Sequence, residues 1–299
     1  ASAGRGAPPA PPAPTPGAVR PAEPQASVAW TAAGRLPASV GLVLAADRPA
    51  EHLNGEAGQS LLALAEDLGL LRETIAGWRS LSRSVGLNQA EALRALLGRR
   101  VLLVCGPGTG VEGSELGPWV VATEVDAPAA ERLRRRLRAV PRSVAGGVPL
   151  LAVEDGRFEA VELPAGFDDA SSRADGVRTV VVARAEDRAL LLEVVRALRG
   201  EPGGSEPRLA SLAEYRRLAS AEGSVRILAR ADAGHAEEGA GGVIAASASA
   251  RGRSWEIAFQ APAGVFGLGG DENGVRGGGR GEAGELIGPE EWAAFEALA

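Results

Sequence analysis

The stretch Gly98–Leu137 decides the fold. It contains two apolar runs, Val101–Cys105 (VLLVC) and Trp119–Val125 (WVVATEV), which are separated by the glycine-rich segment Gly106–Pro118 (GPGTGVEGSELGP). Short apolar runs rich in β-branched residues predict buried strands, and the segment between them has no helical periodicity. Strands joined without a crossover helix run antiparallel. The stretch therefore predicts a hairpin, followed by an arginine-rich helix that begins after Asp126.

The glycine-rich segment resembles a dinucleotide-binding loop, because Gly108–Gly113 matches G-x-G-x-x-G after an apolar strand. In that fold the loop opens a helix whose N-terminus holds the pyrophosphate. Here a second strand pattern follows, and Glu112 and Glu115 would repel a phosphate. A P-loop is excluded because the chain has no lysine. We therefore expect a flexible hairpin connection and no bound nucleotide.

Composition narrows the range of functions. The chain has 299 residues, enough for one or two domains. Its net charge of −6 argues against nucleic acid as the main partner. All 32 basic residues are arginine, so a Schiff-base or general-base lysine is impossible. Aromatic residues make up only 4% and methionine is absent, so the core must consist of Ala, Leu and Val.

The chain contains few residues that could be nucleophiles or metal ligands. The single cysteine, Cys105, lies in an apolar strand pattern, which favours a buried structural role over a reactive thiol and rules out an internal disulfide. The two histidines, His52 and His235, are far apart in sequence. A histidine-rich metal site is therefore excluded. We predict no catalytic, cofactor-binding or metal-binding residues, and no cofactor.

The remaining chain alternates helical and strand patterns. Asn88 followed by Glu91 predicts a capping box at the start of a helix that ends at Gly98, and Asp155-Gly156 between apolar runs predicts a tight hairpin. Further strands are expected at Val40–Ala46, Val148–Val153, Phe158–Leu163, Val177–Ala183, Val225–Ala229, Val243–Ala250 and Ser254–Ala261. Further helices are expected at Gln59–Gly69, Leu70–Val85, Ala129–Ala139, Asp187–Leu198, Leu209–Ala221 and Pro289–Leu298.

These elements predict an α+β fold with curved, mainly antiparallel sheets and with helices packed on one face. At least three strand pairs leave no room for a crossover helix, which a doubly wound parallel sheet would require. The helices Ala129–Ala139 and Asp187–Leu198 each carry one apolar stripe, so we expect both to cover a single face of the sheet.

Composition shifts divide the chain into three parts. Residues 1–26 form a Pro/Ala-rich segment typical of an extended, disordered tether, with a ligand for a polyproline-binding module as the alternative. Residues 27–263 form the α+β domain, and residues 264–299 form a Gly-rich flexible tail with a short terminal helix. Ala1-Ser2-Ala3 before the Pro/Ala tract is typical of sequence that follows a removed signal peptide or a membrane anchor, so we expect export; a cloned or clipped fragment is the alternative.

Four weaker patterns have ordinary structural explanations. The arginines between Arg132 and Arg138 could bind anions but favour a solvated helix face. The pair Asp168-Asp169 could be catalytic or bind metal, although adjacent acids in a loop are usually just exposed. Asp271–Gly274 lacks the alternating ligands of a calcium loop. Arg276–Gly281, which resembles an RNA-binding tract, favours a flexible linker in this acidic chain.

The order of the elements resembles a family of exported bacterial proteins known as domain of unknown function 3352. The residues that carry this resemblance, which spans roughly residues 36–232, are Leu36-Pro37-Ala38-Ser39, Leu96–Val101, Trp119–Asp126 with Ala129–Leu133, Gly147-Val148-Pro149 and Leu209–Tyr215. The resemblance implies an α+β fold with curved antiparallel sheets, exported or anchored at the cell envelope. It implies no activity and no catalytic residues.

Three functions remain after these exclusions. The first is a non-enzymatic, exported or envelope-associated binding or scaffold module, whose partner would be an unknown protein or envelope component. The second is a carrier that holds an apolar ligand in a curved-sheet cavity, which usually needs more large apolar side chains than this chain has. The third is a carboxylate-dependent hydrolase, although G-x-S-x-G and H-E-x-x-H are both missing.

Overall fold

The fold is that of a computed structural model of the chain. The structure describes residues 27–56, 58–59, 88–107, 117–136, 138–145, 147–153, 156–164, 167, 176–201, 205–221, 223–231, 242–251, 254–261 and 275–282. Within these residues the fold is a large, open antiparallel sheet with several helices, so the predicted α+β class is confirmed.

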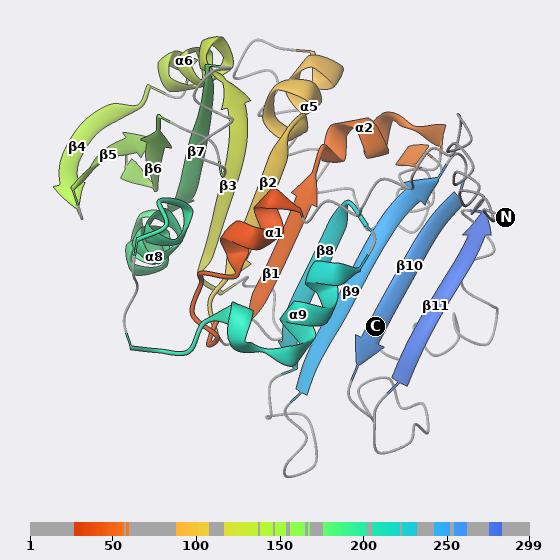
Figure 1. The fold of residues 1–299 in the computed structure, drawn as a ribbon. Coiled ribbons are helices and arrows are strands. Elements are labelled where there is room, and N and C mark those ends of the chain that lie inside the picture. The colour runs from red at the N-terminus through yellow and green to blue at the C-terminus, as the bar shows by residue number, and fades with distance from the viewer. Residues whose placement is uncertain are drawn as a thin grey trace, which may run out of the picture.

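The described strands form one sheet of 11 strands in the order β11-β10-β9-β8-β1-β2-β3-β7-β6-β5-β4 (Figure 1). Each neighbouring pair in this sheet is antiparallel. The strands are β1 (Leu42–Asp47), β2 (Arg100–Cys105), β3 (Trp119–Asp126), β4 (Val140–Ala145), β5 (Val148–Val153), β6 (Phe158–Leu163), β7 (Val177–Arg184), β8 (Val225–Ala231), β9 (Gly242–Arg251), β10 (Ser254–Ala261) and β11 (Val275–Glu282).

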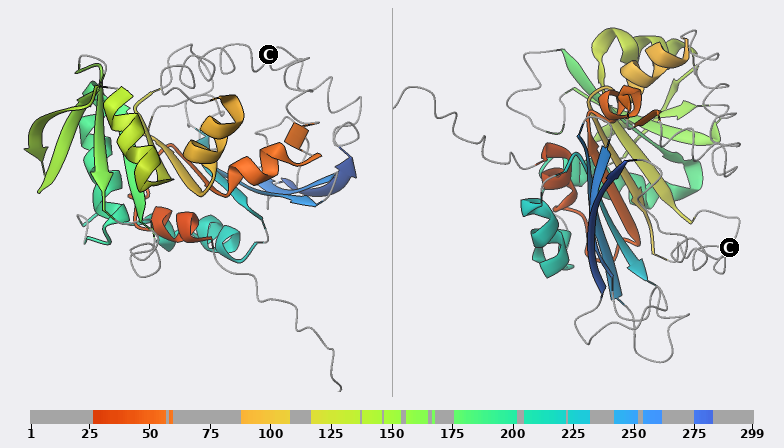
Figure 2. Two further views of the ribbon diagram at one scale, coloured as in Figure 1. Left: turned by 90° about the horizontal axis from the view of Figure 1, so that it is seen from above. Right: turned by 90° about the vertical axis from the view of Figure 1, so that its right-hand side faces the viewer.

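The described helices are short and lie on both sides of the sheet (Figure 2). They are α1 (Val28–Ala33), α2 (Pro49–Asn54), α5 (Gln89–Leu97), α6 (Ala127–Arg136), α8 (Arg188–Leu198) and α9 (Ala213–Ser220), with 3₁₀ turns η2 (Ala185–Asp187) and η3 (Leu209–Ser211). The predicted capping box of α5 is present: Asn88 Oδ1 accepts from the Glu91 amide at 2.9 Å, and Glu91 Oε2 accepts from the Asn88 amide at 3.0 Å.

The main core lies between the sheet and the layer formed by α1, α8 and α9. Alternate residues of the central strands, such as Val43, Leu102 and Val120, are fully buried on this face. Trp30 of α1 and Tyr215 of α9 stack with ring centroids 4.6 Å apart, and the Tyr215 hydroxyl donates to the Trp30 carbonyl. This contact joins the two helices, because it buries two large rings where α1 meets α9.

A second, smaller core lies on the opposite face, where α5 and α6 pack. Leu96 of α5 and Leu133 of α6 cluster there with Val125, whose side chain points away from that of Val120 because strand side chains alternate between faces. The expectation that all helices cover one face is therefore corrected: α8 and α6 lie on opposite faces. Each helix has one apolar stripe as predicted, but a stripe does not specify which face of the sheet it covers.

The predicted hairpins are present. Strand β2 pairs with β3, β5 pairs with β6, and β9 pairs with β10, each antiparallel as the short connections require. Gly156 has φ +90°, a left-handed conformation that glycine adopts without the steric cost of a Cβ. This glycine stands just before β6, at the position where the sequence predicts the turn.

Two strands were not expected from the sequence. Strand β4 begins at Val140, directly after the segment that the sequence pattern assigns to a helix ending at Ala139. Helix α6 instead ends at Arg136, and Arg138 has a left-handed φ of 49°, which a continuing helix does not allow. Strand β11 lies in the segment expected to be a flexible tail, where Val275–Glu282 pairs with β10. Helix α1 was also not expected, although Ser27 caps it by accepting from the Trp30 amide at 3.2 Å.

The sheet edge at β4 carries features that disfavour pairing with another chain. Pro141 lacks an amide hydrogen, and the register shifts between Pro141 and Ser143, which leaves Arg142 in a bulge. Proline, bulges and charge are the usual means by which edge strands avoid edge-to-edge association. The exposed Val140 and Val144, at 60% and 71%, therefore do not by themselves indicate an interface.

Several predictions lie outside the described residues. They are the tether 1–26, the helices Gln59–Gly69 (apart from its first residue) and Leu70–Val85, the Gly108–Gly113 motif with Glu112 and Glu115, Asp155, Asp168-Asp169, His235, Asp271–Gly274 and the helix Pro289–Leu298. Among the residues that are described, no helix has the length and apolar character needed to cross a membrane.

Cys105 is expected to react slowly with thiol reagents in the folded protein. Its side chain is buried at the end of β2, and burial raises the pKa of the thiol, so the reactive thiolate is scarce near neutral pH. Labelling of Cys105 at pH 8 with an aromatic disulfide that releases a coloured thiolate should proceed at least tenfold faster in denaturant than in buffer. Equal rates in both conditions would contradict the buried position.

Candidate functional site

A pocket of ≈ 600 Å³ lies between α8 and the connections at the adjoining end of the central strands. Its walls come from α8, from the residues before β1, from both described ends of the β2–β3 connection and from the segment before η3. The lining residues are Pro37, Ser39, Val40, Gly106, Pro107, Pro118, Glu186, Asp187, Ala189, Leu190, Leu192, Glu193, Arg196, Glu206 and Arg208.

Backbone hydrogen bonds between distant parts of the chain hold the pocket's walls in place. Pro37 and Arg208 form an isolated antiparallel bridge, flanked by hydrogen bonds from the Ala38 amide to the Pro207 carbonyl at 2.8 Å and from the Leu209 amide to the Leu36 carbonyl at 2.9 Å. On the other side, the Gly106 amide donates to the Pro118 carbonyl at 2.7 Å, which closes the base of the β2–β3 connection. The walls are thus fixed although they come from distant parts of the sequence.

Most of the acidic groups in the pocket have arginine partners. Asp187 is buried and accepts from Arg184 Nε at 2.9 Å and from the Trp119 amide at 3.2 Å. Glu186 lies 3.1 Å from Arg184, and Glu193 pairs with Arg196. Asp187 and Glu186 thus hold the segment before α8 against β3 and β7, whereas the Glu193–Arg196 pair lies within α8. Their arrangement suits a structured wall rather than a general base, which would need an accessible, less compensated carboxylate.

The apolar part of the pocket consists mainly of prolines and aliphatic side chains. Pro37, Pro107 and Pro118 line it together with Val40 and Leu190. Such residues present a preformed surface, because proline rings have little conformational freedom to lose on binding. The pocket therefore has the chemistry of a binding site for a partly apolar ligand, with ionised groups at its margin.

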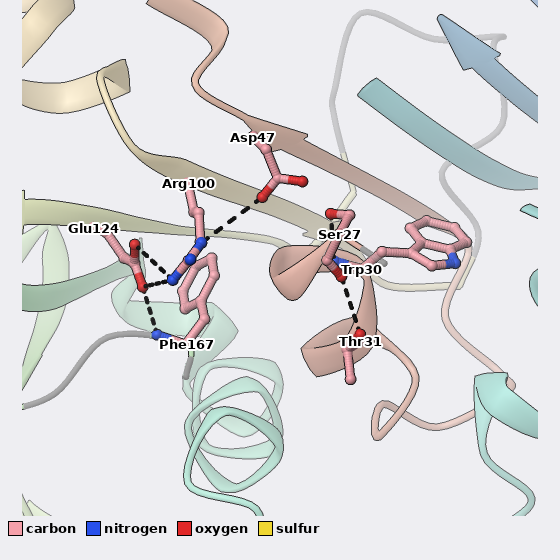
Figure 3. Close-up of polar contacts among 7 residues, drawn as sticks. All are labelled: Ser27, Trp30, Thr31, Asp47, Arg100, Glu124 and Phe167. Carbon is pink, nitrogen blue, oxygen red and sulfur yellow. Dashed lines mark hydrogen bonds and ion pairs between the residues drawn. The ribbon is translucent and has the colours of Figure 1, made fainter. Parts of the chain in front are cut away.

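A second polar cluster lies on the main-core face of the sheet, where Asp47 (β1), Arg100 (β2) and Glu124 (β3) are neighbours (Figure 3). Arg100 Nη1 donates to Glu124 Oε1 at 3.1 Å, and Arg100 Nε lies 3.8 Å from Asp47. The amide of Phe167 donates to Glu124 Oε1 at 2.6 Å. Asp47, Arg100 and Glu124 come from three different strands, so the cluster links β1, β2 and β3.

The Arg100 cluster stabilises the fold and shows no free catalytic group. Glu124 is only 2% exposed, and a buried carboxylate is tolerated only when a cation and hydrogen bonds compensate it. Arg100 and the Phe167 amide supply both. A similar arrangement holds α8: Glu159 is fully buried and accepts from Arg188 Nε at 2.7 Å, with Arg142 of β4 at 3.8 Å.

The residues singled out in the sequence lie apart from one another. His52 is in α2, and Cys105 is buried at the end of β2. Of the arginine-rich helix, Arg134 and Arg135 are exposed and pair with Glu131, whose pKa they lower. This contact pattern is that of a solvated helix face. No group of three potential metal ligands occurs within the part of the chain that the structure describes.

Sequence reasoning missed the pocket and the Arg100 cluster. The only local signal was one charged residue near one end of each of three largely apolar strand patterns: Asp47, Arg100 and Glu124. Strand register, which the sequence does not specify, brings these three together.

Comparisons with known proteins do not assign a family. No family model matches the chain, and no curated protein matches it. A solved structure, described as crystal form I of TP0453, is similar over 89% of this chain and 97% of its own, with 11% identity and a TM-score of 0.36. A likeness at this level carries no argument about function.

Removing the cation from the Arg100 cluster is expected to destabilise the protein strongly. Arg100→Met leaves Glu124 buried with only the Phe167 amide, so the free energy of unfolding should fall by roughly 3 kcal/mol in chemical denaturation. The matched control is Arg99→Met, because Arg99 forms an ion pair with Asp126 in which both side chains are exposed, and it should change stability by less than about 1 kcal/mol. Equal losses in the two variants would contradict the structural role of Arg100.

Proposed function

We propose that this protein is a non-enzymatic binding module, exported or associated with the cell envelope, whose ligand-binding surface is the pocket beside α8. The observation that carries the proposal is the pocket's composition: a fixed wall of prolines and aliphatic side chains, with Asp187 and Glu193 already paired with arginines. A concave site with an apolar lining and few oriented polar groups is the usual form of a binding site.

The physical character of the pocket favours an extended segment of a partner protein over a small metabolite. The lining comes from α8, the residues before β1, the β2–β3 connection and the segment before η3, so it spreads over several elements as a binding surface for an extended chain would. The charged side chains Glu186, Glu206 and Arg208 stand at exposed or half-buried positions. Polar residues at the margin of an apolar centre are typical of protein–protein contacts. The partner in this proposal is therefore a protein or an envelope component with an apolar segment.

Export is a separate part of the proposal and rests on the sequence. The Pro/Ala-rich segment 1–26 is typical of a tether that keeps a folded module away from a membrane or wall. Cells that make the protein should therefore contain it in the envelope or extracellular fraction, as detected by immunoblotting beside a cytoplasmic marker. Recovery with the cytoplasmic marker alone would contradict export and leave the pocket proposal untouched.

Photo-crosslinking tests the pocket. A photoreactive amino acid at Ala189, which is exposed and lines the pocket, should capture a discrete partner in intact cells. The matched control position is Ala213, which is exposed at the start of α9 and lies outside the pocket lining. The photoreactive amino acid at Ala213 should not capture this partner.

Binding of the captured partner, once purified, should weaken at least tenfold with Leu190→Asp, because a carboxylate in the apolar lining adds a desolvation cost. Unchanged affinity, or identical capture from Ala189 and Ala213, would refute the pocket as the binding surface.

A further inference from the structure

Arg226 is the most deeply buried arginine in the part of the chain that the structure describes. Its side chain on β8 is 3% exposed and lies beneath the C-terminal end of α9. Nε donates to the Leu218 carbonyl at 2.9 Å, and Nη2 donates to the Ala221 carbonyl at 2.8 Å. A cation is favourable at a helix C-terminus, because the last carbonyls there carry partial negative charge. The guanidinium thus anchors α9 to the sheet.

The third nitrogen of this guanidinium has no partner. Nη1 of Arg226 is buried and forms no hydrogen bond. The less buried Arg100, Arg184 and Arg188 each lie within 4 Å of a carboxylate, whereas no such ion pair occurs for Arg226 among the described residues. Burial lowers the pKa of Arg226, and the more distant Asp47 opposes this shift. The charge is therefore buried without a contacting counter-ion.

A second unpartnered donor lies next to it. Ser224 lies just before β8 and two residues ahead of Arg226, and its backbone continues the strand pairing: its carbonyl accepts from the Asp47 amide at 2.8 Å and its amide donates to the Ala248 carbonyl at 3.0 Å. Its side chain therefore points to the same face as that of Arg226, with the two Cα atoms ~7 Å apart. The Ser224 hydroxyl is also buried without a hydrogen bond. Ser247, directly opposite Arg226 on β9, is 3% exposed and adds a hydroxyl to the same face. Buried donors without acceptors are rare in folded proteins and indicate an unseen acceptor.

We propose that Arg226 and Ser224 bind a small monatomic anion, of which chloride is the abundant example. The acceptor must be small, because both donor atoms are sealed from solvent and a phosphate or sulfate would need an opening. The positive charge of the Arg226 guanidinium favours an anion over a water molecule as this acceptor. Water could accept from both donors, but the guanidinium charge would then be offset only by carbonyl dipoles and by the more distant Asp47, and buried charges are most stable when directly paired. A monatomic anion accepts from both donors and neutralises the charge.

Chloride titration of the full chain tests this site. The melting temperature should rise with chloride at constant ionic strength, with gluconate as the replacing anion because it is too large to enter. A saturable increase of about 2–4 °C is expected once chloride exceeds its dissociation constant by roughly fivefold. Ser224→Ala should weaken the apparent affinity severalfold, and Arg226→Met should abolish the response. Arg216→Met is the matched control, since Arg216 is exposed on α9, and it should retain the full response.

Crystals grown in bromide give a readout that does not depend on variant stability. Anomalous scattering should place a bromide beside Arg226 Nη1, within reach of the Ser224 hydroxyl. A water at that position, or bromide only at surface sites, would overturn the proposal even if Arg226→Met does not fold. An unsaturable response to chloride that Ser224→Ala leaves unchanged would overturn it as well.

Discussion

Pairing of β1 with two distant partners is the constraint on which the structure depends. Six residues of β1 pair with β2 on one side and five pair with β8 on the other, although β8 (Val225–Ala231) is far from β1 along the chain. This single strand joins the half of the sheet containing β2 to β7 with the half containing β8 to β11. Because a shift of one residue would turn every side chain to the other face, the burial of Val43 and Ala45 fixes the register on both sides at once.

The register then determines where the charges lie. Asp47 stands opposite Arg100, which reaches Glu124 on the next strand, so three residues from neighbouring strands form one compensated cluster. On the other side of β1, Ala45 stands opposite Arg226, whose guanidinium reaches the end of α9. The same sheet face thus carries one arginine with carboxylate partners and one with only carbonyls, and this difference is why Arg226 stands out as an anion site.

The helices on the main-core face connect this framework to the pocket. Trp30 of α1 stacks on Tyr215 of α9, and Arg35, just after α1, donates to the Ala197 carbonyl at the end of α8 at 3.2 Å. Helix α1 therefore lies between α9, whose C-terminal end accepts hydrogen bonds from Arg226, and α8, which lines the pocket. A ligand that shifted α8 would act on the same packed layer that holds α9, since the core residues of all three helices belong to one cluster.

The sequence by itself determined the local pieces: the three hairpins, the capped helix after Asn88, the buried Cys105 and the antiparallel α+β class. These follow from alternation, turn chemistry and capping, which act over a few residues. It could not place β4 or β11, because a short polar or glycine-rich strand forms only when a neighbour supplies hydrogen bonds. Tertiary structure alone decided that α6 and α8 lie on opposite faces, that Arg100 meets Glu124, and that the pocket exists. Each depends on strand order and register, which arise from contacts between residues far apart in the chain and leave no periodic trace in the sequence.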